Sequence, residues 1–272
     1  MPSPKKKYKR ITTNSLLEMK KNKEKIAMLT AYDFTLAKLV DASGVDIILV
    51  GDSASNVVAG HETTLPITLD QMIYHASSVI RGVDRALVVV DLPFGTYQSN
   101  SKIALESAIK IMKQSGAHSV KLEGGSEVRE SMERIIQAGI PVMGHLGLTP
   151  QSIYKFGTYS VRAKNEDEAN KIIDDAKMLE KIGCFGIVLE KIPALLSKKI
   201  AEIVKIPVIG IGAGKDVDGQ VLVLHDMLGM TQDFSPRFLR RYLDLKSEIT
   251  NAIRSYTSDV KLLKFPSDSE QY

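Results

Sequence analysis

Eight short apolar runs recur along the chain, and this recurrence constrains the fold more than any other feature. The clearest run, 45–50, is rich in Val, Ile and Leu and is followed by Gly51, Asp52 and Ser53. An apolar run of this kind, stopped by a glycine, is typical of a strand buried on both faces of a parallel sheet. The eight expected strands are 25–30, 45–50, 86–90, 118–122, 140–143, 185–189, 207–211 and 220–224.

Stretches with helical spacing separate most of these runs. In 101–114, apolar residues follow the i, i+3, i+4, i+7 rule of an amphipathic helix. Strands that alternate with helices predict an α/β fold, and eight of them in 272 residues predict a single-domain (β/α)8 TIM barrel. An open doubly wound sheet is the alternative. However, no Gly-x-Gly-x-x-Gly follows the first strand, and 210–214 is a weak match near the end of the chain.

The predicted organisation has three parts: a basic N-terminal segment at 1–24, the catalytic barrel at 25–265 and a polar C-terminal tail at 266–272. The lysines of the first part would suit an arm that binds nucleic acid, but no aromatic stacking platform accompanies the charge. We therefore interpret this segment as solvated and expect no nucleic-acid partner.

The composition is that of a soluble globular protein. Apolar residues make up 44% and charged residues 25% of the chain, and both values are ordinary. No apolar run approaches the roughly 18 residues that a membrane span needs, and the basic start lacks the apolar segment of a secretory signal. Cys184 is the single cysteine, so no intrachain disulfide can form. We expect a cytoplasmic protein with no membrane partner.

Polar side chains gather where the expected strands end. In a barrel all strand carboxyl ends open onto one face, here called the mouth, where active sites lie. Lys121 lies two residues before Glu123 on one strand, so both side chains point the same way. The expected mouth residues are Asp33, Asp52, Ser53, Asp91, Lys121, Glu123, His145, Glu190 and Asp226.

Six carboxylates in one mouth raise each other's pKa unless cations are present. A divalent cation relieves this cost, and Mg²⁺ suits the site because it leaves room for substrate oxygens and water. The mouth therefore predicts a metal ion together with an anionic, oxygen-rich substrate. Asp33 and Asp226 also have a structural interpretation, because an acid just past a strand often caps the following helix.

Longer motifs occur in order over most of the chain. With them the chain closely resembles the ketopantoate hydroxymethyltransferase family, also named 3-methyl-2-oxobutanoate hydroxymethyltransferase. The matching segments are TAYD (30–33), LVGDS (49–53), GH and TLP (60–66), DLPF (91–94), VKLEGG (120–125), GHLGLTPQS (144–152), LE and IP (189–193), IPVIGIGAG (206–214), DGQVLVLHD (218–226) and GMT (229–231).

The resemblance implies a (β/α)8 barrel enzyme of pantothenate synthesis, assembled as a homodecamer. Its implied reaction transfers a hydroxymethyl group from 5,10-methylenetetrahydrofolate to 3-methyl-2-oxobutanoate. The implied site has three sets of residues: Glu190 as proton acceptor; Asp52, Ser53, Asp91 and Lys121 for the 2-oxo acid; and Asp52, Asp91 and Glu123 for Mg²⁺.

The chain departs from the family pattern in two places. Ser55-Asn56 stands where the family usually has a glycine and an apolar residue, and Lys191 follows Glu190 where a small or apolar residue is common. Neither change removes an implied functional residue.

Two competing hypotheses remain at this point. A Mg²⁺-dependent C–C lyase or mutase of the phosphoenolpyruvate-binding barrel group would typically carry a Lys-Cys-Gly catalytic loop, which the chain lacks. A scaffold with a dead site would have lost one of the four acids at 52, 91, 123 and 190, and all four are present.

Overall fold

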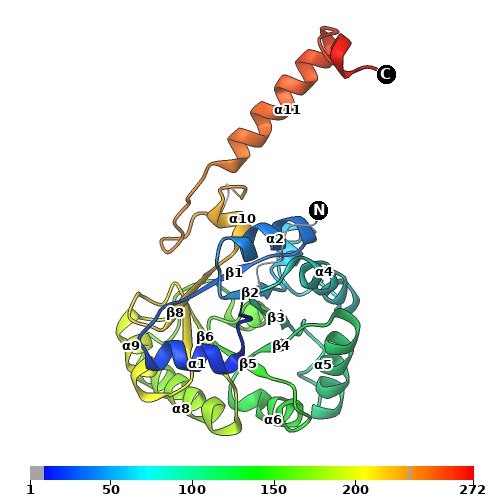
Figure 1. Cartoon of the computed structure of the whole chain (residues 1–272). Coiled ribbons are helices and arrows are strands. Elements are labelled where there is room, and N and C mark those ends of the chain that lie inside the picture. The colour runs from blue at the N-terminus through cyan, green and yellow to red at the C-terminus, as the bar shows by residue number, and fades with distance from the viewer. Residues whose placement is uncertain (1–8, 232–233) are drawn as a thin grey trace. The chain divides into compact units, whose positions relative to one another are not determined.

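The structure, a computed structural model, describes residues 9–231 and 234–272. Eight parallel strands form a closed barrel in sequence order, with helices around it (Figure 1). The predicted (β/α)8 barrel is thereby confirmed, with strand ends within a few residues of those expected. The strands are β1 (Ile26–Thr30), β2 (Ile47–Val50), β3 (Leu87–Asp91), β4 (Ser119–Glu123), β5 (Val142–Gly147), β6 (Gly186–Glu190), β7 (Val208–Ile211) and β8 (Gly219–Leu222).

The barrel closes because β1 pairs with β8 as well as with β2. Ile26 lies opposite Gly219 in this closing pair. A Cβ at position 219 would lie 2.4 Å from the Ile26 carbonyl oxygen and 2.6 Å from the Ile209 side chain, so only glycine fits. Inside the barrel, buried apolar side chains from β1, β2, β3, β5, β6, β7 and β8 form one cluster, as expected of a packed barrel core.

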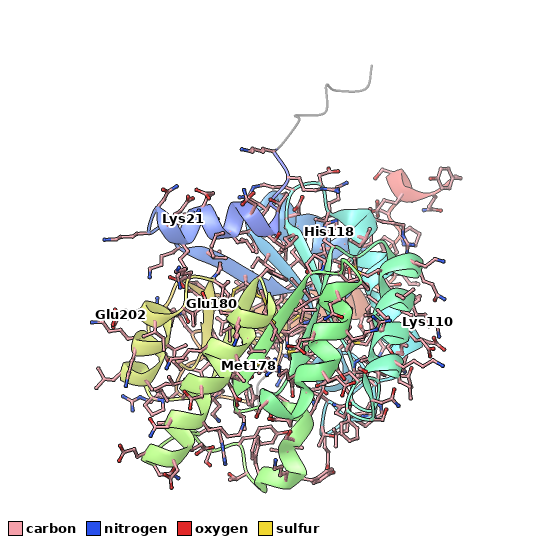
Figure 2. All side chains as sticks on the ribbon, turned by 90° about the horizontal axis from the view of Figure 1, so that it is seen from below. Lys21, Lys110, His118, Met178, Glu180 and Glu202 are labelled. Atoms are coloured by element: carbon pink, nitrogen blue, oxygen red, sulfur yellow. The ribbon has the colours of Figure 1, made fainter. Side chains whose placement is uncertain are left out.

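Helices cover the outside of the barrel, and half of the eight named below begin at a residue whose side chain accepts a backbone N–H. Asn165, for example, accepts from the N–H of Glu168. Charged side chains such as Lys21, Lys110 and Glu202 point away from the barrel (Figure 2). The helices are α2 (Phe34–Ala42), α3 (Ala54–Val57), α4 (Leu69–Gly82), α5 (Ser101–Ser115), α6 (Arg129–Gln137), α7 (Ile153–Phe156), α8 (Glu166–Ile182) and α9 (Ala194–Ile203).

A further helix, α1 (Thr13–Lys21), packs against the barrel at the end opposite the mouth. Leu16 and Met19 are buried in the barrel cluster. Lys20 Nζ donates to the carbonyls of Ala201 and Ile206 and lies 2.7 Å from an oxygen of Asp218. This part of the basic segment is thus folded rather than solvated, whereas Lys5, Lys6 and Lys7 lie outside the described residues.

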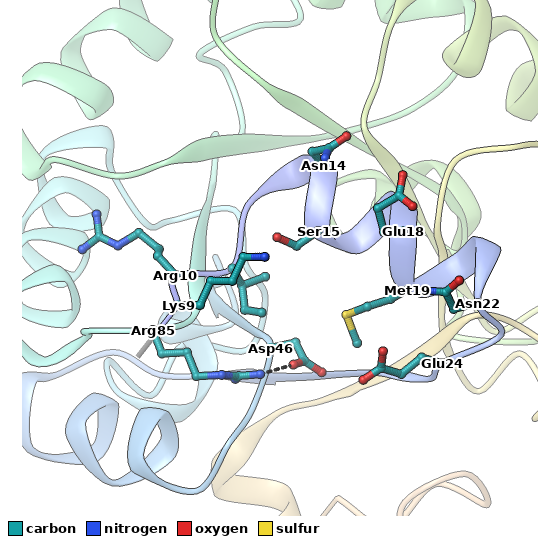
Figure 3. Close-up of a pocket in the computed structure, with 11 residues that line it drawn as sticks. Lys9, Arg10, Asn14, Ser15, Glu18, Met19, Asn22, Glu24, Asp46 and Arg85 are labelled. Carbon is teal, nitrogen blue, oxygen red and sulfur yellow. Dashed lines mark hydrogen bonds and ion pairs between the residues drawn. The ribbon is translucent and has the colours of Figure 1, made fainter. Parts of the chain in front are cut away.

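An open pocket of about 460 Å³ lies beside α1 (Figure 3). Basic and acidic side chains line it together, and Arg85 and Asp46 form an ion pair of 2.7 Å across its floor. Arg85 also donates to the carbonyls of Gly44 and Val45. Arg85 and Asp46 thus pair with each other and with the backbone, so this wall of the pocket helps to support the barrel.

The chain divides into two compact units, Met1–Val223 and Leu224–Tyr272. The second contains α10 (Leu224–Met227), α11 (Leu245–Lys261) and a short 3-10 turn (Asp268–Glu270). The sequence pattern predicts one or two closing helices over 236–263, and the structure has one of them, at 245–261. The stretch before the helix is held by α10 and the residue after it. The backbone N–H of Tyr242 donates to the carbonyl of Met227, and that of Leu245 donates to the carbonyl of Leu228.

Candidate active site

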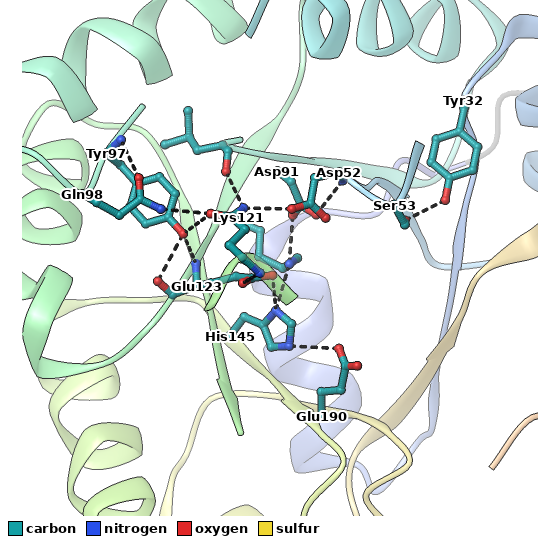
Figure 4. A network of polar contacts seen from close by, with 12 residues as sticks. Tyr32, Asp52, Ser53, Asp91, Tyr97, Gln98, Lys121, Glu123, His145 and Glu190 are labelled. Carbon is teal, nitrogen blue, oxygen red and sulfur yellow. Dashed lines mark hydrogen bonds and ion pairs between the residues drawn. The ribbon is translucent and has the colours of Figure 1, made fainter. Parts of the chain in front are cut away.

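The carboxyl ends of β2 to β6 bring seven predicted side chains together at the mouth (Figure 4). The strand register explains two of the juxtapositions, since Asp91 lies opposite Lys121 and Glu123 lies opposite His145. Five of the seven are buried, while Ser53 and Glu190 are half-buried. The seven are Asp52, Ser53, Asp91, Lys121, Glu123, His145 and Glu190.

The Lys121 ammonium is a positive centre of this cluster. Its Nζ lies 3.0 Å from Asp91 Oδ1 and 3.2 Å from His145 Nδ1. Burial alone lowers the pKa of a lysine, but the negative charges of Asp91, Glu123 and Asp52 outweigh it and raise the pKa of Lys121. Lys121 therefore stays charged and offers a compact cation to an anionic group.

Asp52 and Asp91 are crowded acids in a dry site. Burial raises the pKa of both carboxyl groups, and the charges of Asp91 and Glu123 raise that of Asp52 further. The Lys121 charge opposes these effects without reversing them. Such a pair of carboxyl groups gains from any cation that comes close to it.

His145 links two carboxylates. Its Nδ1 lies 3.4 Å from Glu123 Oε1, and its Nε2 lies 3.3 Å from Glu190 Oε2. Burial and the Lys121 charge lower the pKa of the imidazole, but the two carboxylates outweigh them and raise it to about 9. Burial likewise works to raise the pKa of Glu123, yet His145, Lys121 and a backbone N–H bring it below its ordinary value.

Two residues of the site have no role in the sequence analysis. Gln151 donates from Nε2 to Asp52 Oδ2 at 2.9 Å and from its backbone N–H to Glu123 Oε2 at 2.9 Å. The Tyr97 hydroxyl lies 2.7 Å from Gln151 Oε1. Gln151 does fall within the GHLGLTPQS motif, whereas Tyr97 lies in a loop and carries no sequence signal.

The three remaining residues of the expected mouth, Ser53, Asp33 and Asp226, have different hydrogen-bond partners. Ser53 Oγ lies 2.8 Å from the hydroxyl of Tyr32. Asp33 is exposed and accepts from the N–H of Leu36, so it caps α2. Asp226 lies in α10 of the second unit and accepts a hydrogen bond from the Thr231 hydroxyl.

The departures from the family pattern make local contacts. Ser55 and Asn56 donate side-chain hydrogen bonds to carbonyls within 61–63, which fold the loop after β2 back on itself. Lys191 has a positive φ of 45° and donates from Nζ to the carbonyl of Tyr159. These residues therefore shape loops beside the mouth and leave the predicted site residues in place.

Oxygen atoms suited to a metal ion are present in the cluster. Asp91 Oδ1 and Glu123 Oε1 are buried and have no hydrogen-bond partner besides the ion pairs with Lys121 and His145. Within residues 9–231 and 234–272, no group of three or more His, Cys, Asp or Glu side chains is arranged so that it could hold a metal ion by itself. An ion at this place would therefore need further ligands from substrate and water, as Mg²⁺ commonly takes.

Comparison with known proteins decides the family. The sequence model of the family described as ketopantoate hydroxymethyltransferase matches residues 10–268. The chain is 74% identical to a protein of Flavobacterium johnsoniae named 3-methyl-2-oxobutanoate hydroxymethyltransferase, over 272 residues and 100% of both chains. It is 72% identical, again over 100% of both, to a protein of the same name from Christiangramia forsetii. The chain belongs to the ketopantoate hydroxymethyltransferase family.

Solved structures of other enzymes share the fold of this family member. Phosphonopyruvate hydrolase in complex with oxalate and Mg²⁺ aligns with a TM-score of 0.60 at 10% identity, covering 96% of this chain and 93% of that chain. A 2,3-dimethylmalate lyase of the PEP mutase/isocitrate lyase superfamily aligns with a TM-score of 0.59 at 13% identity, covering 96% and 91%. At such low identity the likeness establishes the barrel fold alone.

Proposed function

We propose that this chain transfers a hydroxymethyl group from 5,10-methylenetetrahydrofolate to C3 of 3-methyl-2-oxobutanoate, giving 2-dehydropantoate for pantothenate and coenzyme A. The observation that carries the proposal is the position of Glu190. It lies beside a buried carboxylate trio, Asp52, Asp91 and Glu123, and is linked to it through His145. Family membership supports the substrate, since 3-methyl-2-oxobutanoate is part of the name of both relatives.

Glu190 is the residue that we assign to remove the C3 proton. The side chain is half-buried at the end of β6, so the substrate can reach it, and its Oε2 is positioned by His145 Nε2 at 3.3 Å. The C3 proton of a 2-oxo acid is too weakly acidic to leave unaided at neutral pH. A positioned general base typically contributes about 10²–10⁴-fold to such a step.

The 2-oxo acid is assigned to Lys121, Ser53, Asp52 and Asp91. Lys121 remains charged at neutral pH, so its ammonium can pair with the substrate carboxylate. The Ser53 hydroxyl is half-buried and oriented by Tyr32, which leaves it able to donate to a substrate oxygen. These contacts set C3 near Glu190 and exclude water from the reacting carbon.

We assign a Mg²⁺ ion to the carboxylate trio. Burial raises the pKa of Asp52 and Asp91, and neighbouring carboxylates raise it further, so a divalent cation close to the trio would favour the ionised carboxylates. Asp52, Asp91 and Glu123 would bind the ion. When bound, Mg²⁺ supplies Lewis-acid polarisation of the keto group, which makes the C3 proton more acidic.

The transfer consumes one molecule of water. Glu190 accepts the C3 proton, and a carbon–carbon bond forms between C3 and the methylene carbon. The two bonds from that carbon to the folate nitrogens break, and water supplies the hydroxyl oxygen. Tetrahydrofolate leaves with a hydrogen on each of these nitrogens. One of these hydrogens balances the proton removed from C3, and the other comes from water. No oxidant, reductant or covalent enzyme intermediate is required.

Exchange of the C3 proton with D₂O, followed by NMR, tests the substrate and the first chemical step together. With Mg²⁺ the native chain should exchange the C3 proton of 3-methyl-2-oxobutanoate, and EDTA should abolish both exchange and turnover. The Glu190→Gln variant should lose about 10²–10⁴-fold in kcat because it has the shape but not the basicity of glutamate. Exchange should fall in parallel, while binding of the 2-oxo acid stays within a few fold.

Glu202→Gln is the matched control, because Glu202 is exposed on α9 and points away from the barrel. It should leave exchange and turnover unchanged. If Glu190→Gln exchanges the proton at the native rate, the base is another residue. Full activity in metal-free buffer would refute the Mg²⁺ assignment.

A lyase or mutase of the phosphoenolpyruvate-binding group is not favoured. The structural neighbours of that kind share only 10–13% identity with this chain, and the family match is to a hydroxymethyltransferase. Cys184, the single cysteine, is buried, and burial raises the pKa of its thiol to about 12. It is therefore unsuited to the catalytic loop of such an enzyme.

The proposal includes assembly and location. The family resemblance supports a homodecamer in the cytoplasm that acts on small molecules and needs no nucleic acid. Among the described residues, no helix has both the length and the apolar character needed to cross a membrane.

A further inference from the structure

Gln151 has the most completely bonded side chain at the mouth. It lies in the 3-10 turn after β5 (Pro150–Ser152) and is buried. Its Nε2 donates to Asp52 Oδ2 at 2.9 Å and to the Leu92 carbonyl at 3.0 Å. Its Oε1 lies 2.7 Å from the Tyr97 hydroxyl and 3.0 Å from Gln98 Nε2.

These four contacts fix the orientation of the amide. A carboxamide has two N–H donors and one oxygen with two lone pairs, so every position of Gln151 is used. The oxygen faces the two donors, Tyr97 and Gln98, so the nitrogen must face Asp52. Turning the amide over would break all four hydrogen bonds in a buried place, where each unsatisfied group is costly.

The backbone of the same residue reaches a second carboxylate. The N–H of Gln151 donates to Glu123 Oε2 at 2.9 Å. The third member of the trio, Asp91, accepts from the backbone N–H of Asp52 through Oδ2 at 3.0 Å. One oxygen of each carboxylate is therefore bonded to an amide N–H, and Gln151 provides two of these three bonds.

The amide bonds decide which oxygen of each carboxylate is left for other partners. In Asp91 and Glu123 the second oxygen, Oδ1 and Oε1 respectively, is buried, and only the ion pair with Lys121 or His145 satisfies it. These oxygens face the cations Lys121 and His145. If the amides were absent, each carboxylate could rotate and present either oxygen, and the arrangement of these oxygens would no longer be unique.

We propose that Gln151 is a positioning residue for the metal site, which fixes the rotation of the Asp52 and Glu123 carboxylates and so decides which of their oxygens is turned to the ion. Tyr97 and Gln98 orient the Gln151 amide. The inference rests on the proposed function, which assigns Mg²⁺ to these carboxylates. Residues that orient metal ligands typically change metal affinity about 10–100-fold when they are mutated.

The test is a titration of Mn²⁺, a paramagnetic substitute for Mg²⁺, followed by EPR without substrate. Gln151→Met is close in length, retains the backbone N–H to Glu123 and removes the amide that contacts Asp52. Its Mn²⁺ affinity should fall about 10–100-fold. The metal concentration for half-maximal turnover should rise in parallel, while kcat at saturating metal stays within a few fold. Gln137→Met, on the exposed side of α6, is the matched control and should bind Mn²⁺ as the native chain does.

The outcomes separate the two levels of the proposal. If the native chain binds no Mn²⁺, the metal assignment and the role of Gln151 are both refuted. If the native chain binds Mn²⁺ and a folded Gln151→Met binds it equally well, only the role of Gln151 is refuted. Should Gln151→Met fail to fold, Tyr97→Phe decides: it removes one donor to the amide oxygen and should weaken Mn²⁺ binding about fivefold. An unchanged affinity in Tyr97→Phe would refute the positioning role.

Discussion

His118 is a histidine that the structure requires to be neutral. The N–H of Val88 donates to its Nδ1 at 3.0 Å, and its own backbone N–H donates to the Val88 carbonyl. A proton on Nδ1 would break the first of these bonds. Burial, and then the nearby charge of Arg10, lower the pKa of the imidazole from its ordinary value of 6.5.

We expect this histidine to make the fold less stable in mild acid. Below pH 6.5 the unfolded chain binds a proton at this position and the folded chain does not, so the free energy of unfolding falls as the pH falls. The loss ends below the lowered pKa of the folded state. Urea unfolding of the native chain and of His118→Asn between pH 5 and 7.5 measures it, since Asn Oδ1 can accept from Val88 and does not titrate. The stability difference between the two should depend on pH; a constant difference would contradict the prediction.

At the residue scale, the sequence predicts side chains whose place is set by a strand. Asp91 and Glu123 follow apolar runs, and parallel strands bring their ends to one face, so their meeting could be inferred without coordinates. Gln151 could not be found in this way. Its position depends on the course of the loop after β5, and its role depends on the rotamers of residues distant in sequence, such as Tyr97. Neither the course of a loop nor the rotamer of a distant side chain leaves a periodic pattern in the sequence.

At the element scale, α1 is a helix that the sequence pattern does not predict. Its lysines suggest solvent exposure, while only two of its residues are buried, Leu16 and Met19. Two buried apolar residues three apart in a nine-residue helix are too few for a reliable period. Tertiary contacts stabilise the helix. Leu16 and Met19 pack in the core of the barrel, and Lys20 donates hydrogen bonds to three residues distant in sequence.

Loss of the α1 contact should destabilise the barrel. Leu16 is fully buried, so Leu16→Ala removes apolar contacts and leaves a cavity. Such changes typically cost about 2–5 kcal/mol, which denaturant unfolding can measure. Leu195→Ala is the matched control, because Leu195 is 83% exposed, and it should change the unfolding free energy by no more than about 0.5 kcal/mol. Equal effects of the two substitutions would show that α1 contributes nothing to stability.

At the scale of the whole molecule, α11 has an apolar side that no described residue of its own compact unit, Leu224–Tyr272, buries. None of its residues is buried. Ile249, Ile253, Tyr256 and Val260 are spaced by three or four residues and are exposed, so they lie along one side of the helix. A soluble protein gains by covering such a face, and the proposed homodecamer offers other copies of the chain for that purpose.

Light scattering should therefore report several hundred kilodaltons, near ten copies of the 29.9 kDa chain. Ile253→Lys places a charge in the middle of the apolar side and should reduce the mass of the assembly. Lys261→Ile serves as a comparison, because it changes the charge in the opposite sense near the end of the same helix. A native chain that is monomeric would contradict the proposed assembly, and an unchanged mass for Ile253→Lys would exclude α11 from the contacts.

The pairing of β1 with β8 has a consequence for synthesis on the ribosome. Ile26 leaves the ribosome about 190 residues before its partner Gly219, a delay of roughly 10–40 s at ordinary elongation rates. Until then the growing sheet has two open edges, the side of β1 and the side of the newest strand, and unpaired strand edges attract other chains. Chaperones that bind nascent chains should therefore meet this protein early and leave it only after β8 has emerged.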